Sequence, residues 1–291
     1  MIAPGYEPDQ QLLALALQSG AKIFLTHDPK IAADGANYIY ADVWASMGQE
    51  SEQKKREEAF KGFCVDSELM GLAAPGVTFE LIGFDTCLMA TLETAAAIAP
   101  YGNYMVASEE YEPGGGWDYL AYPQFIADNP GADGLAVGTA ICDSYYAKCA
   151  SQGTDDMATL SVTDLSAIPD LVAAFDSMAA EMTGVTQDMS SFQSFVQGVT
   201  RAENYGGNTD QEGYTNMVDL GDLVMKTQSV LPGTADDVLD GLFGAVKYEV
   251  AGSSRSEANG LAVFFPLGYD QSTLETFASI TPSAQYVRFV E

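Results

Sequence analysis

The most regular pattern of apolar and polar positions lies in one stretch of the first third of the chain. Val77 to Phe84 is a short apolar run with β-branched and aromatic residues, which is typical of a buried strand in a parallel sheet. Ala90 to Ala99 consists of good helix formers and is followed by Pro100, which cannot continue a helix. The pattern predicts a strand followed by a helix, with Cys87 where the strand gives way to the helix.

The same criteria predict strands and helices along the rest of the chain. Strands and helices are both expected in the first half, whereas helices dominate the second half. We therefore predict an α/β core over residues 1–165 and a smaller, mainly helical region over residues 166–291, with a returning strand near 260–266. Helices are expected at Asp9–Ser19, Leu135–Cys149, Ser166–Met182, Met189–Asn204, Met217–Val230 and Ala235–Lys247, and strands at Lys22–Thr26, Asn103–Ser108, Met157–Val162 and Leu261–Phe265, with a further apolar patch at 36–46.

The chain is strongly acidic, because 41 acidic residues face 12 basic residues and the formal net charge is -29. This charge repels nucleic acid and excludes it as an expected partner, whereas basic peptides and divalent cations would be attracted. Solvation of the surface alone also explains the acidity. No apolar run is long enough to span a membrane, the first residues lack the layout of a signal peptide, and nothing in the sequence indicates an oligomeric state.

Cys87 is the candidate nucleophile among four cysteines, at positions 64, 87, 142 and 149. No Cys-x-x-Cys pair indicates a zinc or redox site, and Cys142 and Cys149 share one face of a predicted helix, where packing explains them. Cys87 follows a predicted strand, at the sheet edge where α/β proteins bind ligands, and a helix N-terminus would favour its thiolate. The alternative is an inert buried cysteine. A serine nucleophile is not expected, because the chain has no Gly-x-Ser-x-Gly turn.

His27 is the only histidine in the chain, so a Cys/His mechanism within this chain must use it. It follows the predicted strand Lys22–Thr26 and precedes the turn signal Asp28-Pro29. A residue at the end of a strand would face the same sheet edge as Cys87. The alternative is a histidine in a surface loop without a catalytic role.

Several blocks of the sequence resemble the clostripain family of cysteine peptidases. The residues from Gly83 to Glu93 read GFDTCLMATLE and closely resemble the segment that carries the nucleophile in that family. Further blocks follow in the family's order up to Pro266. The resemblance implies a caspase-like α/β/α sandwich with a mostly parallel sheet and a smaller, mainly helical C-terminal region. The further blocks are Tyr104–Glu110, Glu112–Trp117, Asn204–Gly207, Gly213–Leu223 and Asn259–Pro266.

The resemblance implies a cysteine endopeptidase that cleaves after Arg or Lys with a Cys-His dyad. Cys87 matches the family's nucleophile, and His27 is expected to be the base, because the family's histidine also lies at a strand end before the cysteine. Glycine follows the histidine in the family, whereas Asp28 follows it here. The family also has about two more strands before that histidine. The chain is therefore expected to be an N-terminally truncated member, with a degenerate member or a wrongly assigned gene start as the alternatives.

Asp85 is the residue that the resemblance assigns to binding of a basic P1 side chain. A carboxylate pairs selectively with a guanidinium group, which supports this role. The alternative for Asp85 is a structural one, as a cap of the following helix or as a support of the loop. The resemblance also places the polar, glycine-rich stretch after the strand Asn103–Ser108 in the substrate groove, which gives Ser108, Glu109 and Trp117 as further substrate-binding candidates.

Self-processing, calcium and export are further expectations from the family resemblance. Lys55 and Arg56 lie in a charged run between His27 and Cys87, where family members cleave themselves at basic residues; the alternative is a solvated helix or loop. The sequence requires no cofactor, and calcium is implied only by the resemblance, without identifiable ligands. Peptides or proteins with basic residues are the expected substrates, and the protein is expected to be secreted or on the cell surface.

Two other functions remain open at the level of sequence. A catalytically impaired relative would keep the fold and bind peptide, and this alternative depends on whether His27 reaches Cys87. A structural cell-surface module would instead have its sheet edge near Cys87 filled by side chains.

Overall fold

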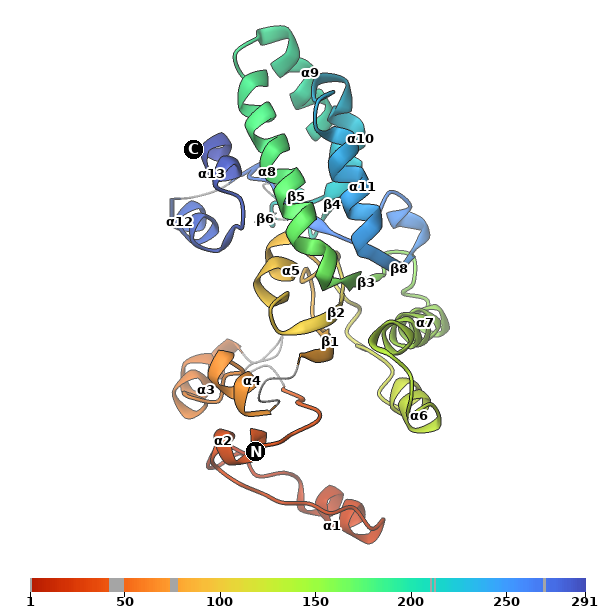
Figure 1. The fold of residues 1–291 in the computed structure, drawn as a ribbon. Coiled ribbons are helices and arrows are strands. Elements are labelled where there is room, and N and C mark those ends of the chain that lie inside the picture. The colour runs from red at the N-terminus through yellow and green to blue at the C-terminus, as the bar shows by residue number, and fades with distance from the viewer. Residues whose placement is uncertain (1, 42–49, 74–77, 210, 212, 269–270) are drawn as a thin grey trace. The chain divides into compact units, whose positions relative to one another are not determined.

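The structure is a computed structural model that describes residues 2–41, 50–73, 78–209, 211, 213–268 and 271–291. It divides into two compact units, Met1–Thr78 and Phe79–Glu291. Figure 1 shows the elements of both units along the chain.

The first unit consists of short helices. The helix predicted at Asp9–Ser19 is formed, and Asp9 caps it, because the carboxylate accepts hydrogen bonds from the N–H groups of Gln11 (2.8 Å) and Leu12 (3.0 Å). Its elements are α1 (Gln10–Gln18), α2 (Pro29–Ala33), η1 (Glu50–Glu52), α3 (Gln53–Ala59) and α4 (Ser67–Ala73).

The predicted strand at Lys22–Thr26 is not formed in the first unit. These residues are assigned no strand, and the Phe24 side chain is 75% exposed. A strand needs a hydrogen-bonded neighbour, and no other strand is present among the described residues of this unit. Most of the apolar patch expected at 36–46 lies outside the described residues.

The second unit contains a four-stranded sheet in the order β1 (Phe79–Gly83), β2 (Gly102–Ala107), β3 (Thr159–Asp164) and β8 (Val246–Ala251). Strands β1 and β2 are parallel and are connected through α5 (Leu92–Ile98), as parallel strands require a crossover. The pairs β2–β3 and β3–β8 are antiparallel. The α/β class is therefore confirmed, but the expectation of a mostly parallel sheet is corrected.

Helices on both faces explain why the strands read as parallel from the sequence. Met105 and Ala107 of β2 belong to the core on one face, which includes residues of α5 and α8 (Ile168–Val185), whereas Val106 belongs to the core on the other face with Ile141 of α7. Figure 1 shows α7 (Gly134–Gln152) and α8 on opposite sides of the sheet. An apolar run thus indicates that both faces of a strand are covered. It does not indicate whether the strand runs parallel or antiparallel to its neighbours.

A smaller antiparallel sheet and several helices complete the second unit. The order of this sheet is β4 (Asn204–Tyr205), β7 (Met217–Asp219) and β9 (Ala262–Phe264), and β5 (Asn208–Thr209) pairs with β6 (Gly213–Tyr214). The remaining elements are α6 (Ala121–Asp128), η2 (Leu165–Ala167), α9 (Met189–Val199), α10 (Leu220–Thr227), η3 (Gln228–Val230), α11 (Ala235–Ala245), η4 (Ser253–Arg255), α12 (Gln271–Ile280) and α13 (Ala284–Val290).

The structure divides the chain at residue 78, not at the expected boundary between residues 165 and 166. Strand β3 ends at Asp164 and pairs with β8, which begins at Val246, so the main sheet continues across the expected boundary. The mainly helical stretch from α8 to α11 therefore belongs to the same unit as β1 and Cys87.

Candidate active site

Cys87 lies in a turn between β1 and α5. Thr91 caps α5, because its hydroxyl accepts the N–H of Thr94 at 3.0 Å, and the helix starts at Leu92. The helix therefore starts at Leu92 and not at the predicted Ala90, and Cys87 lies before the helix cap. The dipole of α5 does not act directly on the thiol, because the effect of a helix dipole is confined to the first turn.

The turn after Cys87 is held in an uncommon backbone conformation. Leu88 has φ 62, which few residues other than glycine adopt. Hydrogen bonds on both sides fix the segment, because Ala90 donates its N–H to Ser108 O (2.9 Å) and accepts the N–H of Ala262 at its carbonyl (2.8 Å). Strained turns that are fixed in this way are enriched at functional sites.

The sulfur of Cys87 accepts a hydrogen bond from a main-chain donor. The N–H of Glu112 points at Cys87 Sγ with an N–S distance of 3.3 Å. Cys87 is a free, half-buried thiol, whereas Cys142 and Cys149 are buried, and burial raises the pKa of both of these thiols. The expected packing role of Cys142 and Cys149 is confirmed, and Cys87 is the cysteine of this unit whose side chain is not buried in the core.

Asp85 supports the glycine-rich loop. Its carboxylate accepts the N–H of Trp117 (3.2 Å) and the hydroxyl of Tyr119 (2.7 Å). Gly116 has φ 58, and a Cβ added there would lie 2.9 Å from Asp85 Oδ2. Since Thr91 caps α5, the structural role of Asp85 is to hold this loop, not to cap the helix.

Glu112 is the second acidic residue beside Cys87. Burial, followed by the neighbouring Asp85 carboxylate, raises the pKa of Glu112 to about 9, so its side chain is neutral at pH 7. Its Oε1 accepts the indole N–H of Trp117 at 3.3 Å. The sequence places Glu112 in the acidic cluster after β2, but no local pattern assigns it a separate function.

Three predicted substrate-binding side chains lie in the interior. Ser108 is 0% exposed, Glu109 2% and Trp117 5%. Ser108 bonds to Thr159 Oγ1 at 3.0 Å, and the ring of Trp117 covers Gly83, where an added Cβ would lie 2.8 Å from it. Protein atoms therefore cover most of these three side chains, and their role in substrate binding stays a prediction.

A buried acidic network joins blocks that are far apart in the sequence. Asp219 accepts hydrogen bonds from Tyr205 Oη (3.0 Å) and from the N–H of Asn259 (2.8 Å). Burial, together with the charge of Asp219, holds the pKa of Glu109 well above its usual range. The sequence did not indicate this network, because its members become neighbours only through the pairing of β4, β7 and β9.

His27, Lys55 and Arg56 belong to the first unit. His27 is exposed, and its Nδ1 lies 2.7 Å from Ile2 O, so an imidazole that donates there has its lone pair on Nε2. Lys55 and Arg56 lie within α3, and Arg56 forms an ion pair with Glu52 at 3.1 Å. None of these residues is in the unit that contains Cys87.

The described residues contain no group of three or more His, Cys, Asp or Glu side chains arranged to hold a metal ion. Among the helices that the structure describes, none has the length and apolar character needed to cross a membrane.

The clostripain family model matches residues 67–277, which is more than half of the chain and includes Asp85, Cys87 and Glu112. The chain belongs to the clostripain family. This match confirms the resemblance seen in the sequence blocks from Gly83 to Pro266.

Solved structures of clostripain-family proteins have a similar fold. A clostripain from Bacteroides thetaiotaomicron ATCC 29148, in complex with the peptide inhibitor BTN-VLTK-AOMK, aligns with a TM-score of 0.50 at 17% identity and covers 78% of this chain and 97% of that chain. A secreted C11 cysteine protease from Bacteroides thetaiotaomicron, in complex with an irreversible peptide inhibitor, aligns with a TM-score of 0.51 at 18% identity and covers 76% of this chain and 61% of that chain. At this identity the likeness shows the fold.

The first unit is similar to a different family. Residues 1–79 match the Asp/Orn-binding domain of aspartate/ornithine carbamoyltransferases. Over 75 residues the chain is 72% identical to the ornithine carbamoyltransferase of Oleidesulfovibrio alaskensis and 69% identical to that of Nitratidesulfovibrio vulgaris, which is 26% of this chain and 25% of each relative. The chain thus spans about a quarter of the length of the curated carbamoyltransferases it matches.

The two family matches overlap over residues 67–79, and the division between the two structural units, after Thr78, lies within this overlap. His27, Lys55 and Arg56 all lie in the carbamoyltransferase-like segment, before the clostripain match begins. The clostripain match therefore gives no support to His27 as the catalytic base or to Lys55 and Arg56 as processing sites, and these assignments stay predictions.

Proposed function

We propose that the second unit carries the nucleophile of a cysteine endopeptidase, with Cys87 attacking the peptide carbonyl after an Arg or Lys residue. The observation that carries this proposal is the clostripain match, within which Cys87 occupies a strained turn and accepts a main-chain hydrogen bond. Hydrolysis of an Arg-amide or Lys-amide substrate by the whole chain tests it.

The proposed reaction has an acylation step and a deacylation step. The Cys87 thiolate forms a bond to the carbonyl carbon, main-chain N–H groups stabilise the oxyanion, and the amine leaves after it takes a proton from an imidazolium. Water then attacks the thioester, an imidazole takes its proton, and the carboxylic acid product is released from the sulfur. His27 is the only imidazole that this chain can supply.

Binding of a basic P1 side chain is proposed for the acidic pair formed by Asp85 and Glu112. Asp85 is half-buried and directly precedes the nucleophile turn, and Glu112 contacts both Cys87 and Trp117. With Glu112 neutral at pH 7, the pair presents the negative charge of one carboxylate to a guanidinium or ammonium group.

Replacing Asp85 by asparagine is expected to lower kcat/KM for an Arg substrate at least about tenfold, because one charge-assisted pair is lost. The amide oxygen can still accept from Trp117 and Tyr119, so the loop remains in place. The matched control is a substrate with citrulline at P1, which has the shape of arginine without its charge. Equal losses for both substrates would contradict the pocket role of Asp85.

A second candidate function is peptide binding without turnover. It is favoured by the position of His27 in the carbamoyltransferase-like segment, because residues 79–291 contain no histidine. An Arg-containing peptide that binds in fluorescence anisotropy but is not cleaved after long incubation would support this candidate over the peptidase.

Self-processing at Lys55 or Arg56 is a further proposal. These residues lie in α3, so cleavage requires local unfolding of this short helix. We expect wild type to yield two fragments on long incubation with calcium, and the double variant Lys55→Ala/Arg56→Ala to remain intact. A single intact wild-type band would contradict self-processing. Calcium dependence and export are also proposals that rest on the family.

A further inference from the structure

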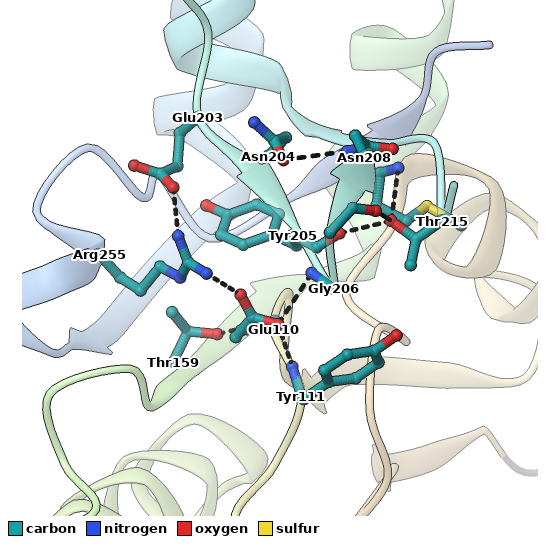
Figure 2. Close-up of polar contacts among 12 residues, drawn as sticks. Glu110, Tyr111, Thr159, Glu203, Asn204, Tyr205, Gly206, Asn208, Thr215 and Arg255 are labelled. Atoms are coloured by element: carbon teal, nitrogen blue, oxygen red, sulfur yellow. Dashed lines mark hydrogen bonds and ion pairs between the residues drawn. The ribbon is translucent and has the colours of Figure 1, made fainter. Parts of the chain in front are cut away.

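Glu110 lies next to the candidate site and has an unusually complete set of polar contacts (Figure 2). Its carboxylate forms an ion pair with Arg255 and accepts the main-chain N–H groups of Tyr111 (2.7 Å) and Gly206 (2.9 Å). Its own N–H donates to Thr159 Oγ1 at 3.1 Å. Glu110 is only 2% exposed, so these contacts replace water around a buried carboxylate.

Arg255 connects Glu110 to the small sheet. Its guanidinium also pairs with Glu203 at 2.6 Å, and its Cζ lies 5.6 Å from the centroid of the Tyr205 ring. Glu203 directly precedes β4, and Tyr205 is the last residue of this strand; Figure 2 shows both side chains beside Arg255. We call the Glu110–Arg255 ion pair the clamp. It joins the segment after β2 to a residue 145 positions away in the sequence.

Glu110 of the clamp lies two residues before Glu112, whose N–H contacts the thiol. The carbonyl of Glu110 accepts the N–H of Leu88 at 3.3 Å, and two residues later the N–H of Glu112 donates to Cys87 Sγ at 3.3 Å. The intervening residue, Tyr111, has its N–H bound by the Glu110 carboxylate. The direction of the Glu112 N–H therefore depends on where the Glu110 side chain is anchored.

We propose that the clamp is a positioning device that holds the Glu112 N–H against Cys87 Sγ, so that a main-chain donor stabilises negative charge on the sulfur. A buried Glu–Arg pair contributes little net free energy to folding, because desolvation of the two charges offsets their attraction. Orienting the neighbouring Glu112 N–H is a role that this pair can have instead. This inference rests on the proposed function, since it concerns the same thiol, but it does not require turnover. It provides thiol activation within a unit that contains no histidine.

The test is the rate at which iodoacetamide alkylates Cys87 in the folded whole chain at pH 7, measured by mass spectrometry of the peptide. Glu110→Ala is expected to reduce this rate about threefold, because the sulfur loses much of one hydrogen bond that stabilises its negative charge. The matched control is Glu203→Gln, which alters the other partner of Arg255 and is expected to leave the rate unchanged.

Arg255→Lys is the second variant, because it keeps the positive charge and loses the fork that reaches both glutamates. This variant is also expected to lower the alkylation rate about threefold, for the same reason. If Glu110→Ala shows no cooperative unfolding, and is therefore not folded, the rate of Arg255→Lys decides the test. An unchanged rate in the folded variants, or an equal fall in Glu203→Gln, overturns the proposal. Absence of peptide turnover in wild type would overturn the proposed function but would leave these alkylation rates fully interpretable.

Discussion

Replacing Cys87 by alanine is expected to reduce hydrolysis of an Arg-amide substrate by about 10⁴-fold or more, because no other group near this turn can form the acyl intermediate. Among the described side chains of the second unit, the other two thiols are buried in the core around α7. The measurement is initial velocity with a fluorogenic Arg-amide, at a substrate concentration far below KM.

The matched control for this prediction is Cys64→Ala, which removes an exposed thiol from the first unit. It is expected to keep the wild-type rate. Residual activity within tenfold of wild type in Cys87→Ala would assign the hydrolysis to another residue or to a contaminating peptidase.

Replacing His27 by alanine is expected to lower the same hydrolysis by about 10²- to 10⁴-fold, the range that general acid–base catalysis contributes. Alkylation of Cys87 by iodoacetamide is expected to change much less, since the Glu112 N–H that contacts the sulfur is not affected. The two measurements together separate loss of the base from loss of the nucleophile.

Asp28→Ala is the control for His27→Ala, because it changes the neighbouring residue, which caps α2, and leaves the imidazole in place. Unchanged hydrolysis in His27→Ala would show that His27 is not the base. Since His27 lies in the carbamoyltransferase-like segment, the base would then have to come from outside this chain, or from a residue other than histidine.

Local patterns predicted the elements whose signals lie within a few residues. The helices predicted at Asp9–Ser19 and Leu135–Cys149 are both formed, as α1 and α7. Strand β1 and the nucleophile turn were also predictable, because a short apolar run followed by Asp85 and Cys87 matches a family block.

Long-range pairing could not be predicted in the same way. The stretch from Met217 to Val230 reads as one helix, but Met217–Asp219 forms β7 because β4 and β9 provide hydrogen-bonding partners on both sides. Ser108 and Glu109 read as exposed because polar residues after a strand usually form a loop. They are buried because distant segments, which include Thr159 and Gly260, contact them.

The family of the segment that contains His27 could not be predicted from this one sequence. A histidine after an apolar run, upstream of a nucleophile block, fits the order of a Cys/His peptidase. That order contains no information on whether the two segments belong to one family. The division at residue 78 and the match of residues 1–79 to carbamoyltransferases supply this information.

The central claim is that Cys87 is a nucleophile beside a site for a basic side chain. The most direct test is to incubate the whole chain with a peptidyl acyloxymethyl ketone that ends in Lys and to locate the adduct by mass spectrometry. We predict one adduct, at Cys87, which forms more slowly when an Arg-containing peptide is present in excess and when Lys is replaced by norleucine. Modification of Cys64 at an equal or higher rate, without dependence on the P1 residue, would contradict the account.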